Sequence, residues 1–344
     1  MGHGRTWLLA VTLAACSGGG GGSDAAIADG TPADGPAADG LVLTWVGVTT
    51  WLLQYQDTAV LLDAYTSRQP WSDTGGNQLG AELLADLRAA SEVDDVAAVL
   101  VGHAHFDHGF DLGAAAAAGA AVYGSQTTCY LTQAQGVAPA GCTVVAGGDS
   151  FSVGALTVRA VRLAHSFPAG IGQFDELDAP PALPLDETSV PVGAQLAYHV
   201  EAADDPSLSL FFYDNFAAVD ADDGSGEDYA AALAAAYPVG TRARVWLAGV
   251  LPGAAGELAS EAQIEAYLDR VQPDALLAQH WDDLTADPRL GLDAPFAAPA
   301  GWAAATAARD LPLLAPAQYF DRFAIGAAGL VRLPDSPLRD HYGL

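Results

Sequence analysis

The sequence predicts a mixed α/β fold with buried strands, and two observations point to it. From residue 41 onward, short runs rich in β-branched and aromatic residues alternate with stretches of helical hydrophobic periodicity. The alternation comes in two successive rounds, each a set of strands followed by strand–helix units. A chain of 344 residues with 51% hydrophobic content can bury a large core. We therefore expect one domain over residues 41–344.

The elements of the first round are expected between residues 41 and 123. Three β-rich runs from Leu41 to Tyr65, separated by Gly47-Val48 and Gln56-Asp57, predict a meander of strands. A helix over 78–90 presents an apolar face and leads into a buried strand over 96–101. An Ala-rich helix over 111–120 and a strand over 121–123 follow.

The second round is expected to repeat this pattern at wider spacing. Ser260 and Gln263 form a capping box at the start of a helix with a buried apolar stripe. Strands are predicted over 155–164, 195–201, 207–213, 244–250 and 275–278, with a final strand near 323–333, and helices over 227–237 and 260–271. The Pro- and acid-rich stretch 166–193, which contains Phe167 and Phe174, is a candidate lid.

Charge limits the classes of partner. The formal net charge is -29, and all 13 basic residues are arginine. A nucleic-acid site needs a basic stripe that releases counterions, so we expect no nucleic-acid partner. The absence of lysine excludes a lysine Schiff base and a P-loop. The acidity fits a saline habitat and a GC-rich genome equally well.

The N-terminal segment predicts export. Residues 1–15 carry one arginine and a short apolar run, typical of a secretory signal peptide. The run ends in Leu13-Ala14-Ala15-Cys16, which resembles the bacterial lipoprotein box and implies Cys16 as a lipid anchor; an ordinary signal peptide with an incidental cysteine is the alternative. Residues 16–40 have almost no large apolar side chain and predict a flexible tether. Ser17 favours the periplasmic face of the outer membrane.

Two further cysteines, Cys129 and Cys142, would lie in an oxidising compartment. A disulfide between them would stabilise the fold by about 3 kcal/mol in the loop-entropy model. Two free, buried thiols are the alternative, because the sequence does not give the distance between their Cα atoms. Neither cysteine lies near a second soft ligand, which disfavours metal binding.

The densest polar pattern is VLVGHAHFDHGFD, from Val99 to Asp111. It begins as a buried strand, and His103, His105, Asp107 and His108 follow within six positions. Side chains at i and i+2 of an extended chain point the same way, so the first two histidines can bind one metal ion while Asp107 and His108 face a second. Imidazole and carboxylate suit zinc, with iron or manganese as alternatives.

This H-x-H-x-D-H pattern resembles the signature of the metallo-β-lactamase superfamily. The resemblance covers the chain after the tether and implies an αββα sandwich of two mixed β-sheets flanked by helices. It implies His165 and His280, each at a strand end, as the last ligand of the first and second ion. It also implies Asp214 as the bridging carboxylate, with Asp220, Asp222 and Asp223 as competitors, and Asp63 as a support of the metal loop. The polar His199 lies away from any motif position, where packing is expected.

The resemblance implies a dinuclear zinc hydrolase. Two ions sharing a bridging hydroxide would attack the substrate, and Asp107 would carry a proton toward the leaving group. No serine nucleophile is needed, and no G-x-S-x-G pattern is present. TWVGVTTWLLQ, Ala-His165-Ser and His280-Trp281 look most like the branch containing ascorbate-phosphate lactonase and N-acylphosphatidylethanolamine phospholipase D, which implies ester, lactone or phosphodiester cleavage.

Two alternatives from other classes remain. Iron in the same fold would give a redox enzyme, although the flavodiiron type has Glu where His105 stands. A surface-tethered metal-binding lipoprotein without activity is the other alternative. The chain departs from the branch at Tyr213-Asp214-Asn215, where Gly-Asp-Thr is common. Few basic residues surround the motifs, which disfavours a strongly anionic substrate.

Overall fold

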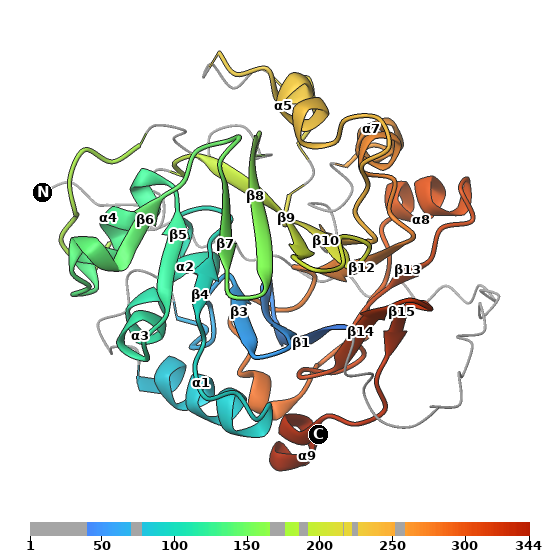
Figure 1. The fold of residues 1–344 in the computed structure, drawn as a ribbon. Helices are drawn as coiled ribbons and strands as arrows, with labels where there is room; N and C mark the ends of the chain where they lie inside the picture. The colour runs from blue at the N-terminus through green and yellow to red at the C-terminus, as the bar shows by residue number, and fades with distance from the viewer. Residues whose placement is uncertain are drawn as a thin grey trace, which may run out of the picture. The chain divides into compact units, whose positions relative to one another are not determined.

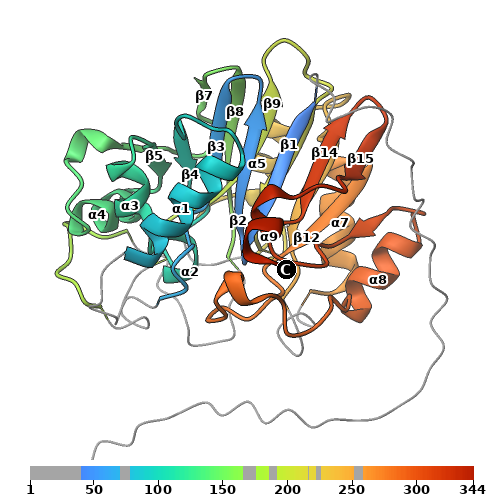
Figure 2. The same cartoon turned by 90° about the horizontal axis from the view of Figure 1, so that it is seen from below.

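The computed structural model describes residues 40–69, 78–165, 176–185, 192–215, 217–221, 226–251 and 259–344. All of them belong to one compact unit of the chain, Pro36–Leu344. Within them, an eight-stranded and a seven-stranded β-sheet pack face to face, with helices on their outer sides (Figures 1 and 2). The predicted αββα sandwich of two mixed sheets is confirmed.

The first sheet has the strand order β15-β14-β1-β2-β3-β4-β5-β6. Neighbours from β15 to β3 run antiparallel, whereas β3 to β6 run parallel. Its strands are β1 (Leu41–Gly47), β2 (Thr50–Tyr55), β3 (Thr58–Leu62), β4 (Ala98–Leu100), β5 (Ala121–Gly124), β6 (Cys142–Val144), β14 (Arg322–Gly326) and β15 (Gly329–Arg332).

The second sheet repeats this plan in the order β13-β12-β11-β10-β9-β8-β7. Neighbours from β7 to β10 run antiparallel and those from β10 to β13 parallel. Its strands are β7 (Ser150–Val153), β8 (Leu156–Leu163), β9 (Gln195–Ala202), β10 (Ser209–Tyr213), β11 (Val245–Gly249), β12 (Ala275–Gln279) and β13 (Leu313–Leu314).

The helices cover the outer faces of the sheets. Figure 1 shows α1, α3 and α9 on one side of the paired sheets and α5, α7 and α8 on the other. The helices are α1 (Gln78–Ala90), α2 (Phe106–Gly109), α3 (Leu112–Ala117), α4 (Gln126–Ala134), α5 (Tyr229–Ala236), α7 (Glu261–Val271), α8 (Ala300–Ala307) and α9 (Pro337–Tyr342), with 3₁₀ turns at Pro139–Gly141 and Pro288–Leu290. None of the helices in these ranges combines the length and apolarity needed to cross a bilayer.

The core lies between the sheets and under the helices. Strands such as β3 and β10 are buried at every position, which explains their continuous apolar sequence. The indoles of Trp45, Trp51 and Trp246 are fully buried in it. The predicted capping box of α7 is present, because the Ser260 side chain accepts from the Gln263 N–H and the Gln263 side chain accepts from the Ser260 N–H.

One local expectation needs correction, and three helices were not expected from the sequence. The final strand is a hairpin, β14–β15, whose turn follows Gly326 and ends at Gly329 with φ +102°. The segment between the cysteines contains α4, which begins at the Ser125 cap although its threonines have low helix propensity. Helices α8 and α9 were not predicted, because the Ala-rich α8 lacks periodicity and α9 is short.

The structure joins Cys129 on α4 to Cys142 on β6 by a disulfide, with 5.4 Å between the Cα atoms. The alternative of two free thiols is therefore set aside. The predicted signal peptide (1–15), the anchor Cys16 and the tether up to residue 39 lie outside the described residues, as do Phe167 and Phe174 of the candidate lid.

Candidate metal centre

The predicted ligands lie at strand ends on one edge of the sandwich. His103 and His105 follow β4, while Asp107 and His108 lie on the short helix α2. In the second sheet β8, β10 and β12 share one direction, because β9 runs antiparallel to both β8 and β10 while β10, β11 and β12 are parallel. The residues that follow these three strands, His165, Asp214 and His280, therefore reach the same edge.

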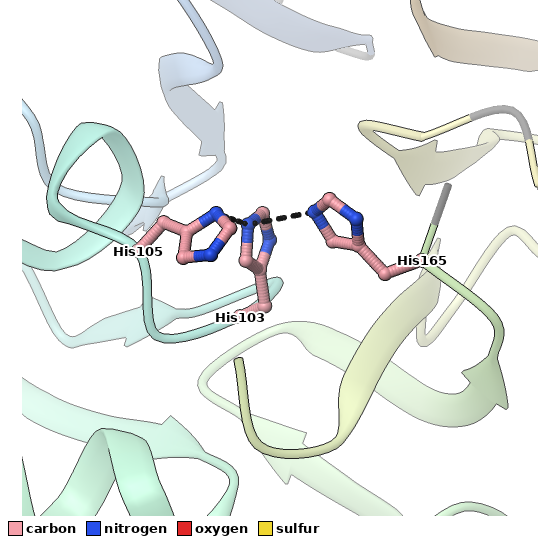
Figure 3. A group of neighbouring side chains, drawn as sticks. All are labelled: His103, His105 and His165. Atoms are coloured by element: carbon pink, nitrogen blue, oxygen red, sulfur yellow. Dashed lines mark hydrogen bonds between the residues drawn. The ribbon is translucent and has the colours of Figure 1, made fainter. Parts of the chain in front are cut away.

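Three histidines form the first group of ligand atoms. Figure 3 shows the ring of His103 between those of His105 and His165. Its Nε2 lies 3.0 Å from His105 Nδ1 and 3.1 Å from His165 Nε2. Burial, reinforced by the neighbouring His103, lowers the pKa of His105 to about 3. Burial likewise lowers the pKa values of His103 and His165, which favours the neutral form that binds a metal ion.

Asp107, His108 and His280 form the second group. Asp107 Oδ2 lies 3.1 Å from His280 Nε2 and 3.6 Å from His108 Nε2. All three side chains are buried. The His103 and His108 rings lie 3.8 Å apart by their centroids, so the two groups are adjacent.

Asp214 lies between the two groups. Its Oδ2 is 3.3 Å from His103 Nδ1 and 3.5 Å from His108 Nε2, so one oxygen faces a ring of each group. Its Oδ1 accepts a hydrogen bond of 2.8 Å from the side-chain amide of Gln195. Of the competing carboxylates, Asp220 is exposed and in none of the ligand groups found among the described residues, and Asp222 and Asp223 lie outside those residues.

Asp63 contacts the ligand loop at two points. Its Oδ2 lies 2.6 Å from His108 Nδ1, and its Oδ1 accepts the Gly102 N–H at 2.7 Å. Thr49 Oγ1 is 3.1 Å from the same histidine nitrogen. With Nδ1 held from two sides, the His108 ring presents Nε2 to Asp107 and Asp214.

The charge and spacing of these atoms fit divalent cations. Burial lowers the pKa of His108, but the carboxylates of Asp63, Asp107 and Asp214 outweigh it and raise that pKa to about 10. His108 Nε2 and Asp214 Oδ2 are buried without a hydrogen-bond partner in the described part of the chain. Two ligands about 2.0 to 2.1 Å from zinc at tetrahedral angles lie about 3.3 Å apart, close to the separations seen here.

Sequence reasoning missed Gln195 and Thr49. Gln195 is a buried polar residue at the start of β9, and such a residue next to a ligand-bearing strand end is a usable signal. Thr49 offers no comparable signal. His199 is buried and lies 2.8 Å from the Tyr237 hydroxyl and 3.1 Å from Glu201 Oε2, so it packs away from the ligand groups as expected.

The described part of the candidate lid is tied to α4. Glu176 accepts the Thr127 N–H through Oε2 at 2.6 Å and the Ala194 N–H through Oε1 at 2.9 Å. The Leu177 N–H donates to the Thr127 hydroxyl at 2.9 Å. This segment is therefore held beside the start of β9 and Gln195, while its role as a lid stays a prediction.

The fold and the ligand groups together describe an α/β sandwich with a buried candidate metal centre of histidine and aspartate. Residues 42–204 match the family model of the beta-lactamase superfamily domain. The match includes the ligand loop and His165 but ends before Asp214 and His280. No curated protein matches the chain.

Three solved structures illustrate the likeness in fold. The metallo-beta-lactamase fold protein YhfI from Bacillus subtilis shares 14% identity at a TM-score of 0.47, covering 83% of this chain and 99% of that one. Igni18, a metallo hydrolase from Ignicoccus hospitalis, shares 15% sequence identity at a TM-score of 0.48. The match covers 83% of this chain and 99% of Igni18. CmlA, a diiron beta-hydroxylase from Streptomyces venezuelae, shares 12% sequence identity at a TM-score of 0.48. The match covers 85% of this chain and 54% of CmlA. Likeness at this level decides neither metal nor substrate.

Proposed function

We propose that the protein is a dinuclear metal-dependent hydrolase that cleaves an ester, lactone or phosphodiester bond in a small molecule. The observation that carries the proposal is the position of Asp214. One of its oxygens faces His103 of the first ligand group and His108 of the second. The ligand atoms of His103, His108 and Asp214 also form a group of their own, which connects the other two groups. A carboxylate in this position could contact ions in both groups, and hydrolases with two metal ions hold them about 3.5 to 4 Å apart. The match of residues 42–204 to the beta-lactamase superfamily domain supports the same class.

The ligand residues would be divided between two metal ions. His103, His105 and His165 would hold one ion, and Asp107, His108 and His280 the other. Asp214, which forms a third group with His103 and His108, would contribute to both. Zinc suits this donor set, and two such ions would acidify a shared water and polarise the oxygen that gains charge during cleavage. Burial raises the pKa of Asp107, but His108 and His280 hold it well below its usual value. Asp107 is thus ionised and able to accept a proton on its way to the leaving group.

An uncharged ester or lactone suits the site better than a phosphodiester. The chain has 13 cationic residues against 42 acidic ones. Arg68, whose backbone lies in the segment after β3, has its guanidinium engaged by Asp282 and by the Val46 and Asp283 carbonyl oxygens. It is therefore engaged within the protein rather than available to a phosphate, whose charge the metal ions would help to neutralise.

The metal content and the hydrolytic activity of the purified protein test this function. The protein should start after Cys16 and be purified without chelator or added metal, and its metals should be identified by elemental analysis. We expect about two zinc ions per chain and turnover of lactones or esters from a panel that also holds phosphodiesters and β-lactams. A chelator should abolish turnover, and zinc should restore it. Two irons without hydrolysis would replace the proposal by the redox alternative, and two zinc ions without any turnover by the non-catalytic one.

We also propose that the protein is exported and anchored to the cell envelope through a lipid on Cys16. The disulfide between Cys129 and Cys142 supports an oxidising compartment. Labelled fatty acid should enter the full-length protein in a bacterial host and be absent from Cys16→Ala. Equal labelling of both proteins would contradict the anchor.

A further inference from the structure

The loop between β1 and β2 is strained where it meets the second ligand group. Val48 has φ +48° and His280 has φ +62°, a region that side-chain-bearing residues rarely adopt. The two residues are joined, because the His280 N–H donates to the Val48 carbonyl oxygen at 2.8 Å. Such backbone conformations are unfavourable for residues with a side chain and persist only where the surroundings enforce them.

Asp282 provides one of the enforcing contacts. Its side chain is buried, and Oδ1 accepts the Val48 N–H at 2.8 Å. Its Oδ2 accepts from the Tyr319 hydroxyl at 2.9 Å and from Arg68 Nη2 at 3.1 Å. The carboxylate two residues after His280 therefore fixes the loop to which the His280 backbone is bonded.

Arg68 completes the arrangement from the other sheet. Its side chain is 2% exposed. The guanidinium lies over the rings of Tyr65 and Tyr319, 5.6 Å and 5.4 Å from their centroids, and donates to the Val46 carbonyl oxygen. A Cβ on Gly47 would lie 1.8 Å from Arg68 Nη2, so a glycine at this position leaves room for the charged group.

The same loop touches a second ligand. Thr49, next to Val48, lies 3.1 Å from His108 Nδ1. The loop is thus in contact with His108 and His280, two of the three members of the second group. We infer that Arg68 and Asp282 are positioning residues that hold the Val48–Thr49 loop and, through it, the geometry of the second metal site. This inference rests on the proposed function.

A role in stability alone is the competing explanation. Substitutions of the Arg68–Asp282 pair can distinguish it from a positioning role. Removing one partner leaves a buried, uncompensated charge, which is destabilising whatever its role. Replacing both partners by apolar residues of similar volume is often neutral or stabilising. The variant Arg68→Met with Asp282→Leu would keep the fold while removing the carboxylate that binds the Val48 N–H.

The test measures zinc affinity and stoichiometry in wild type and in this double variant, with thermal unfolding of the metal-free proteins as a check of the fold. We expect two ions in wild type and, in the variant, one retained ion and a second bound about 10- to 100-fold more weakly. Amide hydrogen exchange of residues 46–50 in metal-free protein should rise in the variant. Asp321→Asn is the control, since this carboxylate is likewise buried and bound by arginine side chains, those of Arg332 and Arg339. It should retain both ions.

A folded double variant that binds two ions with wild-type affinity would overturn the inference and leave the proposed function standing. Wild type that binds no zinc would overturn both. If the double variant does not fold, Tyr319→Phe decides by the same measurement, because it removes only one donor to Asp282. We expect this variant to weaken the second ion selectively, and unchanged affinity for both ions would again overturn the inference.

Discussion

The two sheets contribute to the metal centre in different ways. The first supplies His103, His105, Asp107 and His108 from one continuous segment after β4. The second supplies His165, Asp214 and His280 one at a time, from the ends of three strands that are far apart in sequence. The ligands of the first sheet, the first half of the centre, are therefore recognisable as one sequence motif. Those of the second sheet, the second half, come together only because three parallel-running strands end at the same edge.

This difference has a structural consequence for the supporting contacts. In the first half Asp63 and the Gly102 amide brace the ligand loop from within the same sheet. In the second half Gln195 binds Asp214 within the second sheet, and two backbone contacts cross to the first sheet, because the Leu196 N–H donates to the Gly102 carbonyl oxygen at 2.7 Å and the His280 N–H donates to the Val48 carbonyl oxygen at 2.8 Å. The scattered ligands thus depend on packing of the two sheets, and the variants below probe each half.

The largest effect is expected from the first half. His103→Ala removes the ring whose two nitrogens face the first group and Asp214, so metal binding and turnover should be lost together. Zinc stoichiometry and hydrolysis of the best panel substrate measure this. His199→Ala is the control, because this buried histidine contacts Tyr237 and Glu201 instead. Loss of zinc from His199→Ala would disprove the ligand assignment.

The second half should respond to loss of a support. Gln195→Ala removes the hydrogen bond that leaves Asp214 Oδ2 facing the two groups. We expect zinc affinity to fall by about 10- to 100-fold, with the fold retained. Competition with a chromophoric chelator gives the affinity. Gln54→Ala, which removes another strand amide that donates to the Ser91 carbonyl oxygen, should leave affinity unchanged.

A smaller effect, on stability alone, is expected from the disulfide. Cys129→Ser with Cys142→Ser opens a short loop, since the cysteines are separated by 13 residues in sequence. The free energy of unfolding should fall by about 3 kcal/mol in urea titration. Zinc stoichiometry should stay at the wild-type value, because α4 and β6 carry no ligand. A variant that loses zinc would show that the disulfide supports the site as well.

The smallest effect is electrostatic and lies on β9. The hydrogen bond with His199 lowers the pKa of Glu201 below its ordinary value of 4.5. Such a carboxylate stabilises the fold above about pH 4.5 and loses this contribution as pH falls through its lower folded pKa. The Glu201 side chain is partly exposed, and screening by solvent keeps the contribution small. The unfolding midpoint of Glu201→Gln should therefore decline less between pH 5 and pH 3 than that of wild type, and an equal decline would refute the coupling.

The sequence predicted the fold and the ligands unequally. Periodicity located α1 and α7 because each buries a regular apolar stripe, and buried apolar runs located β3, β10 and β12. The ligand loop could be recognised from its spacing alone. His165, Asp214 and His280 followed only from a family resemblance, because nothing local distinguishes them from other polar residues at strand ends.

Contacts between distant segments could not be predicted at all. Arg68 and Asp282 meet across the two rounds of the fold, and neither has a patterned neighbourhood that indicates the other. The same applies to Gln195 and Asp214, whose contact depends on the antiparallel pairing of β9 with β10. The helix α4 was missed because a serine cap, rather than apolar periodicity, defines its start.

The common direction of β8, β10 and β12 constrains how this protein can change. Because side chains alternate along a strand, a one-residue insertion inside any of them would turn its terminal ligand toward the opposite face. Insertions in the connections between these strands leave that alternation intact. The length and sequence of the connections can therefore diverge freely while the metal ligands stay in place, so that related chains can acquire different substrates without rebuilding the centre.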